Sequence, residues 1–111
     1  MPLLRLGEAL SYIEENYDQP VALGQLASIA HLSKNQFLRV FKQGLGRSPK
    51  NYLIRLRIQK ACELMRDPNK TITQISYEVG FNDGNYFSRR FKHLMGRGAR
   101  DYRQKFLPEP R

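Results

Sequence analysis

Two polar sets in this sequence combine residue types that hydrogen-bond well to the edges of nucleic-acid bases. They are Asn35, Leu38, Arg39 and Lys42, and then Asn85, Ser88, Arg89 and Lys92. Asn and Arg make bidentate hydrogen bonds to adenine and guanine, and an apolar side chain such as that of Leu38 suits a thymine methyl group. Spacings of three and four residues place each set on one side of a helix. Each set therefore predicts a base-contacting face, and Gln36 lies beside the first and can join it.

A second group of basic residues stands at helix ends, turns and flanks, where a sugar–phosphate backbone would pass. Contacts to phosphate position a protein on a duplex without reading its sequence. The phosphate-contacting candidates, which include the lysine of each polar set, are Lys34, Lys42, Arg47, Lys50, Arg90, Lys92 and Arg97. Three further cations, Arg55, Arg57 and Lys60, have two alternative roles: they meet phosphate, or they cover their own helix and pair with a neighbouring glutamate.

The charge distribution favours a polyanionic partner. The 111-residue chain carries a net charge of +9, which is a strong positive field for a protein of this size. Eight basic and no acidic residues lie between residues 34 and 60, and seven basic residues and one acidic residue lie between residues 89 and 106. A merely soluble protein scatters both signs. Two basic blocks therefore predict two contact patches.

Other kinds of chemistry lack the residues they need. The two histidines are isolated, no Gly-rich loop is suited to hold phosphate, and no carboxylates cluster; an enzyme is excluded, and neither a metal site nor a cofactor is expected. The single cysteine, Cys62, lies in an apolar helical stretch and is predicted to be a buried, inert thiol. No apolar run is long enough to span a bilayer. We expect a cytoplasmic protein.

An internal repeat places the two polar sets in equivalent positions. The pattern of residues 41–52 returns in residues 91–102, including a Phe-Lys pair, a Gly-Arg pair and a final Tyr. Upstream, the pattern of residues 23–32 returns in residues 72–81. The offset is 50 residues in the first case and 49 in the second. The chain therefore contains two related supersecondary units in tandem.

Each unit is predicted to form a helix, a tight turn and a second helix. In the first unit, His31 stands at the turn and tolerates a positive φ, and Ser33 with Gln36 forms a capping box for the second helix. In the second unit, Thr71 begins a capping box and Gly80 allows the turn.

The second helix of each unit combines an inward apolar face with clear ends. Asn82 or Asp83 can cap the second of these helices, and Gly46 and Gly96 end the two helices. The inward residues are Phe37, Val40, Phe41 and Leu45 in the first unit, and Phe87, Phe91, Leu94 and Met95 in the second.

Three more helices complete an all-α fold of about seven helices. One covers about residues 3–17, a long one starts at Pro49 and runs to Asp67, and a short one covers residues 99–106. The 18 residues from Pro49 to Arg66 would span about 27 Å, somewhat less than the distance of about 34 Å between successive major grooves on one side of B-DNA. The expected parts are subdomain 1 at about 3–47, the linker helix at about 48–67 and subdomain 2 at about 70–107.

Each of the two units contains specific sequence motifs. The second unit contains Ile75-Ser76-Tyr77-Glu78-Val79-Gly80-Phe81, then Tyr86-Phe87-Ser88-Arg89-Arg90-Phe91-Lys92 and Gly96. The first unit contains Leu26-Ala27, Phe41-Lys42 and Gly46-Arg47-Ser48-Pro49. Over about residues 6 to 106 the chain closely resembles AraC/XylS-type transcription regulators. His31 and Ala99 depart from the family pattern, which commonly has Gly and Pro there.

The resemblance implies two tandem helix-turn-helix subdomains joined by a long linker helix, each offering a recognition helix to the major groove of double-stranded DNA. It also implies transcription regulation, RNA polymerase as a partner, and a separate sensing or dimerisation domain outside this chain.

Two alternative functions are a charge-driven RNA or membrane-surface binder and a protein-interaction module. Against the first, the paired phenylalanines fall on inward stripes, so base stacking and membrane insertion lack exposed aromatic rings. Against the second, Arg39 and Arg89 stand in matching places on both outward faces.

Overall fold

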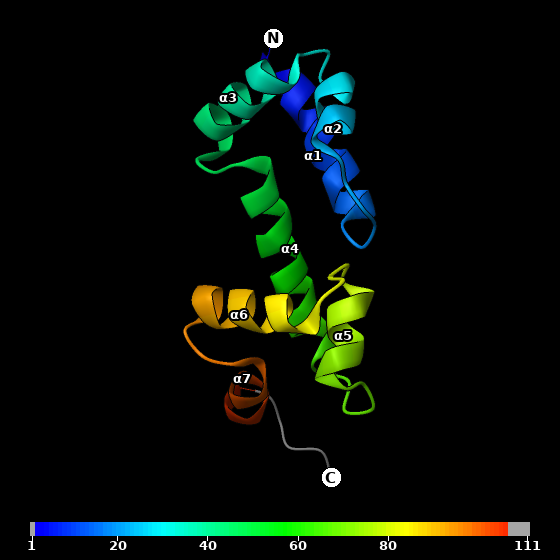
Figure 1. The fold of residues 1–111 in the computed structure, drawn as a ribbon, viewed down its shortest axis with the longest axis vertical. Helices are drawn as coiled ribbons and strands as arrows, with labels where there is room; N and C mark the ends of the chain where they lie inside the picture. Colours follow the sequence, from blue (N-terminus) through cyan, green and yellow to red (C-terminus); the bar gives the residue numbers. More distant parts are fainter. Residues whose placement is uncertain (1, 107–111) are drawn as a thin grey trace. The chain divides into compact units, whose positions relative to one another are not determined.

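The structure, a computed structural model, describes residues 2–106, with side chains from Arg5 onward. This part of the chain contains seven α-helices and no strand, so the predicted all-α fold is confirmed (Figure 1). The helices are α1 (Pro2–Asn16), α2 (Leu23–Ile29), α3 (Lys34–Leu45), α4 (Pro49–Leu64), α5 (Ile72–Glu78), α6 (Gly84–Met95) and α7 (Ala99–Phe106). Residue 107, the predicted end of the second subdomain, lies outside the described residues. Between residues 2 and 106, no helix has the length and apolar character needed to cross a membrane.

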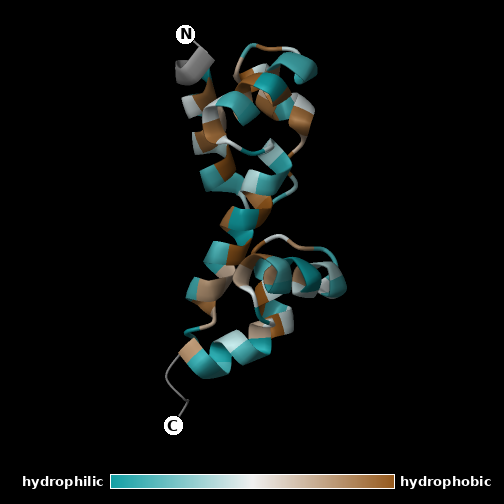
Figure 2. Cartoon of the chain, turned by 90° about the vertical axis from the view of Figure 1, so that its left-hand side faces the viewer, coloured by the Kyte–Doolittle hydropathy of each residue, from teal (hydrophilic) through white to brown (hydrophobic). Residues whose placement is uncertain are grey.

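The helices form two compact units that meet inside α4, between Ile54 and Arg55. In the first unit α1, α2 and α3 pack against one another, and α1 and α2 lie side by side (Figure 1). Amphipathic helices of this kind alternate hydrophobic and hydrophilic residues, as Figure 2 shows along the chain. The buried apolar side chains of the first unit are Leu6, Ala9, Ile13, Leu26, Ala27, Ala30, Phe37, Phe41, Leu53 and Ile54.

The second unit consists of the later turns of α4 together with α5, α6 and α7. Helix α6 packs against both α5 and α7. Its buried apolar side chains are Leu56, Ile58, Ala61, Met65, Ile75, Val79, Phe81, Phe87, Phe91 and Ala99.

Similar aromatic contacts hold α3 in the first unit and α6 in the second, the two helices that the resemblance predicts to be recognition helices. Phe41 meets the ring of Tyr52 edge-on at a centroid distance of 5.7 Å, and Phe91 meets Tyr102 in the same way at 5.6 Å. Such edge-to-face pairs are favourable beyond their buried area. The start of α4 therefore covers α3 in the first unit as α7 covers α6 in the second.

The linker helix is shorter than predicted. Helix α4 ends at Leu64 and has 16 residues, which span about 24 Å. Beyond it, the amides of Arg66 and Asp67 donate to carbonyls three residues back, at 3.3 and 3.0 Å, so the chain tightens into turns before Pro68. Pro68 disfavours a helical conformation only at Asp67, the residue before it, and α4 ends three residues earlier than that position.

One residue predicted to face inward does not do so. Met95 is 37% exposed, whereas Phe87 and Phe91 on the same helix are buried. Met95 is the last residue of α6, directly before Gly96. At that position the chain leaves the helix, and the end of the inward stripe is partly exposed.

Candidate nucleic-acid interface

The tight turns that set each recognition helix against its preceding helix have closely similar hydrogen bonds. The amide of Leu32 donates to the carbonyl of Ala27 at 2.9 Å, and the amide of Phe81 donates to that of Ser76 at 3.0 Å. The turn residue has a positive φ in both units, 57° at His31 and 106° at Gly80. The predicted turn positions are therefore confirmed, including the histidine at a position where glycine fits more easily.

Each recognition helix begins and ends at residues that suit those positions. The Ser33–Gln36 capping box starts α3, and Asp83 caps α6 by accepting a hydrogen bond from the amide of Asn85 at 2.9 Å. Gly46 and Gly96 end the two helices with φ of 78° and 80°. Fixed ends and a buried inner face hold the outer side chains in a defined register.

The first set of base-contacting candidates lies on the exposed side of α3. Asn35, Gln36, Leu38 and Arg39 are all exposed, as is Lys42 one turn further on. Leu38 is an apolar side chain on this polar surface, with 37% of it exposed. Phe37 and Phe41, in contrast, are completely buried. The structure thus brings the first set together on one face.

Gln36 differs from its neighbours because its side chain already has a partner. Its Oε1 atom accepts a hydrogen bond from the amide of Ser33 at 3.1 Å, as part of the capping box. That leaves the amide nitrogen of the side chain as the group with which Gln36 can contact a base.

The second set of base-contacting candidates occupies the equivalent face of α6. Asn85, Ser88 and Arg89 are exposed, together with Lys92. The guanidinium carbon of Arg89 lies 5.9 Å from the ring centroid of Tyr86, within the range of a cation–π contact.

Tyr86 lies beside this face and was not singled out from the sequence. It occupies the position that Gln36 has in the first unit, and it packs on Phe81 with a centroid distance of 6.0 Å. Together with Arg89 and Arg57 it lines a cleft of about 290 Å³ beside the turn. The spacing of three residues between Tyr86 and Arg89 was the available signal, since side chains three apart on a helix are neighbours.

The phosphate-contacting candidates differ in solvent exposure and in the contacts that their side chains make within the protein. Lys34, Lys42, Lys50 and Lys92 are exposed. Lys34 extends along α2, where its Cε atom occupies the space next to Gly24. Arg47 and Arg90 are half-buried, and the Nε atom of Arg90 is buried with no hydrogen-bond partner among the described residues.

Arg97 has partners inside the protein. Its Nη1 atom lies 3.6 Å from the carboxylate of Asp101, and its guanidinium lies 4.9 Å from the ring centroid of Phe106. Both partners belong to α7. Arg97 therefore helps to hold α7 on α6, and these contacts compete with the phosphate contact predicted for it.

The linker cations partly cover their own helix. Lys60 lies 3.7 Å from the carboxylate of Glu63, and the guanidinium of Arg57 lies 5.8 Å from the ring centroid of Phe81. Of the two roles open to these residues, the contacts of Lys60 and Arg57 favour the structural one.

The half-buried thiol of Cys62 lies near Tyr102 rather than in a reactive site. Burial raises the pKa of Cys62, with a hydrogen bond to Tyr102 acting in the opposite direction. Burial also raises the pKa of Tyr102. A raised pKa lowers the thiolate fraction, and the thiolate is the nucleophile. No group of three or more His, Cys, Asp or Glu side chains suited to hold a metal ion occurs within residues 5–106.

Comparison with known proteins decides the family. A family model described as a helix-turn-helix domain matches residues 26–105. The crystal structure of a transcriptional regulator from Chromobacterium violaceum, of the AraC-type DNA-binding domain-containing proteins, is 32% identical, with a TM-score of 0.84 over 93% of this chain and 92% of that one. The chain belongs to the AraC-type helix-turn-helix family.

Family membership makes this chain a DNA-binding domain of the transcription-factor type and not an enzyme. Among curated relatives, the HTH-type transcriptional activator RhaS of Citrobacter koseri is 36% identical over 100 residues, which are 90% of this chain and 36% of RhaS. The chain spans about a third of the length of the curated relatives it matches. The DNA-binding domain of AdpA, whose structure was solved with a target DNA, shares the fold with a TM-score of 0.84 at 23% identity.

Proposed function

We propose that this AraC-type domain binds duplex DNA sequence-specifically by placing α3 and α6 in major grooves, and that it regulates transcription in this way. Asn35, Arg39, Asn85 and Arg89 would read base edges, with Gln36, Leu38 and Ser88 adding contacts. Exposed cations on and around the two helices would hold the phosphates.

The observation that carries the proposal is the pair of exposed arginines at matching positions. Arg39 and Arg89 lie on the outer faces of two helices whose inner faces are buried and which both end at a left-handed glycine. An arginine with a defined register suits bidentate recognition of guanine. The AdpA domain of the same fold was crystallised with a target DNA, which supports DNA as the ligand.

Selection of bound sequences from random duplexes tests the proposal. We expect a preferred site without two-fold symmetry, since tandem units in one chain repeat direction. Binding should also weaken steeply with salt, with a log–log slope of roughly −5 to −9 for about six to ten phosphate contacts. Equal affinity for all duplexes would contradict sequence-specific binding and leave charge alone as the cause.

We further propose that the domain acts within a longer regulator in the cytoplasm. The match to about a third of each curated relative supports a separate sensing or dimerisation domain, and the activator name of RhaS supports RNA polymerase as a partner. In vitro transcription with the full-length gene product, with and without a selected site upstream of the promoter, tests this. Transcription that is indifferent to the site would contradict it.

A further inference from the structure

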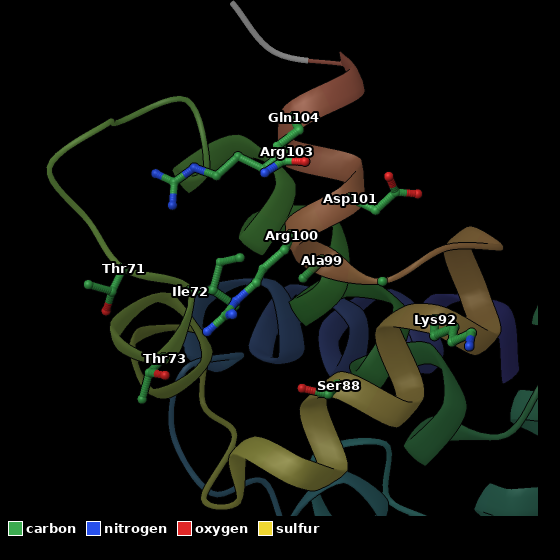
Figure 3. A pocket seen from close by; sticks show the side chains of 11 residues that line it. Thr71, Ile72, Thr73, Ser88, Lys92, Ala99, Arg100, Asp101, Arg103 and Gln104 are labelled. Carbon is green, nitrogen blue, oxygen red and sulfur yellow. The ribbon is translucent and has the colours of Figure 1, made fainter. Parts of the chain in front are cut away.

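A cleft of about 820 Å³ lies beside the recognition helix of the second unit (Figure 3). One wall is formed by Ser88 and Lys92 of α6. The other walls come from the first turn of α5, at Thr71 and Thr73, and from α7, at Arg100. Ser88 and Lys92 belong to the exposed face proposed to enter the major groove, so the cleft continues that face sideways onto α7.

The lining of this cleft is hydroxylic and basic. Lys92, Arg100 and Arg103 line it together with the hydroxyls of Ser88, Thr71 and Thr73. In Figure 3 the side chain of Arg100 runs from α7 across the cleft toward the start of α5. Within residues 5–106, neither Lys92 nor Arg100 forms an ion pair, so no carboxylate neutralises either charge.

The other two charged groups of the cleft have structural partners. Arg103 donates hydrogen bonds from Nε to the carbonyl of Met65 at 3.0 Å and from Nη2 to that of Asp67 at 2.5 Å, just beyond the end of α4. Asp101 lies 3.6 Å from Nη1 of Arg97 and 3.8 Å from Nζ of Lys105. The single carboxylate is therefore offset by two cations, while Arg103 anchors the helix that carries Arg100.

Resting on the proposed function, we infer that this cleft receives the phosphodiester backbone of one DNA strand and that Arg100 is its principal contact. A recognition helix in a major groove is flanked by the backbones of both strands. The cleft borders α6 on the side of Ser88 and Lys92, it is open to solvent, and its free charges are positive. Helix α7 then serves as a third DNA-contacting element.

The internal repeat supports this assignment from a separate direction. With the offset of 50 residues, Arg100 stands where Lys50 stands in the first unit. Both are exposed, and both are the second residue of the helix that covers a recognition helix. The repeat thus keeps a cation at the same place on both covering helices.

The replacement Arg100→Gln tests the inference, with Lys105→Gln as the matched control. Both changes remove one positive charge from an exposed position on α7, but Lys105 does not line the cleft. We expect Arg100→Gln to weaken binding to all duplexes alike and to reduce the slope of log affinity against log salt by about 0.9, which corresponds to one phosphate. Lys105→Gln should change the slope much less, and both variants should melt at the wild-type temperature.

A scan with single neutral methylphosphonates along a selected duplex locates the contact. At one position, a methylphosphonate should weaken binding of the wild type and of Lys105→Gln. The same methylphosphonate should not weaken binding of Arg100→Gln. Equal slopes and equal scans for the two variants would overturn the inference. A second result would also overturn the inference: millimolar inorganic phosphate stabilises the wild type but not Arg100→Gln, while the two proteins bind DNA equally well. The cleft would then be a site for a free anion and not for the DNA backbone. The salt slopes can be measured on any duplex, whereas the proposed function is tested by selection from random duplexes. The inference can therefore fail while the selection still shows sequence-specific binding. It can also hold when the selection finds no preferred sequence.

Discussion

The two arginines that we propose to read guanine differ in their surroundings. Arg89 lies against the ring of Tyr86, whereas the equivalent neighbour of Arg39 is Gln36, whose Oε1 atom is held in a capping box. An aromatic ring restrains a guanidinium before it meets its ligand, and a side chain that is already ordered loses less entropy on binding. The two units therefore share residues for recognition but not the means of ordering them.

Replacing either arginine should relax base preference at a single position. We expect Arg39→Ala and Arg89→Ala each to cost about 1 to 3 kcal/mol of binding free energy on the preferred site. Lys50→Ala should instead weaken all sequences alike. The measurement is a repeat selection from random duplexes with each variant, and an unchanged consensus for Arg39→Ala would refute its assignment as a base reader.

The role of Tyr86 can be separated from simple packing. Tyr86→Gln, which introduces the residue of the first unit, should weaken binding to the preferred site by about 0.5 to 1 kcal/mol, because the cation–π contact with Arg89 is lost. Tyr86→Phe keeps the ring and should bind nearly as the wild type does. The decisive readout is a double-mutant cycle with Arg89→Ala on the preferred duplex. Additive effects of Tyr86→Gln and Arg89→Ala would show that the two side chains act independently.

At the scale of helices, the recognition helices are held by buried rings and by glycine ends. Phe37 packs on Phe41, and Phe87 on Phe91, as tilted ring pairs with centroid distances of 5.5 and 5.7 Å. Gly46 and Gly96 adopt the left-handed conformation at which the helices stop. These features fix which side of each helix faces solvent.

Loss of a buried ring should unfold the domain rather than change its sequence preference. Phe91 is completely buried and contacts both Phe87 and Tyr102. We expect Phe91→Ala to lower the free energy of unfolding by roughly 3 to 5 kcal/mol. Calorimetry in the absence of DNA measures this loss, and a melting temperature equal to that of the wild type would contradict the described core.

Gly96 ends α6 because of its backbone conformation and not because a side chain would lack room there. A Cβ at Gly96 would meet no atom within 4 Å, but the residue has a φ of +80°. Gly96→Ala should therefore cost about 1 kcal/mol of stability. Gly84→Ala is the control, since Gly84 has equal space without a positive φ, and it should cost nothing. Equal melting temperatures for Gly96→Ala and the wild type would show that the helix can end in another way.

At the scale of the whole molecule, one helix joins the two units that we propose to contact DNA. Helix α4 runs from Pro49 to Leu64 and contains the boundary between the units. Under the proposed function, the length of α4 would set the phase at which the second recognition helix follows the first along the DNA. Simultaneous use of two grooves, as we propose, requires one such phase.

Inserting one alanine between Ile54 and Arg55, at the boundary between the units, should abolish binding through both units. The insertion rotates the following residues by about 100° about the helix axis, while the buried residues of each unit stay on one side of the insertion point. The control is Gln59→Ala, which leaves the length of α4 unchanged at an exposed position. Footprinting measures the outcome, and protection of both segments of the site at wild-type affinity would mean that α4 acts as a flexible tether.

Much of this architecture is determined by local sequence. The two capping boxes, the glycine ends and the apolar stripes of α3 and α6 depend on residues three or four apart, and the structure confirms them. Periodicity also decides which side of a helix is exposed, and for this reason Arg39 and Arg89 were found as surface residues from the sequence alone. The repeat then relates the two units, and the motifs indicate the family.

Tertiary structure decided which of the exposed charges have partners. Arg97 is occupied by Asp101 and Phe106, and Arg103 binds carbonyl groups 36 and 38 residues away in sequence. The exposure of Met95 likewise shows that helical periodicity does not decide how far a side chain is covered. Helical periodicity specifies the direction in which a side chain points, but it contains no information about what lies there. The cleft around Arg100 could not be predicted from periodicity either, because its walls come from three helices that only the tertiary structure brings together.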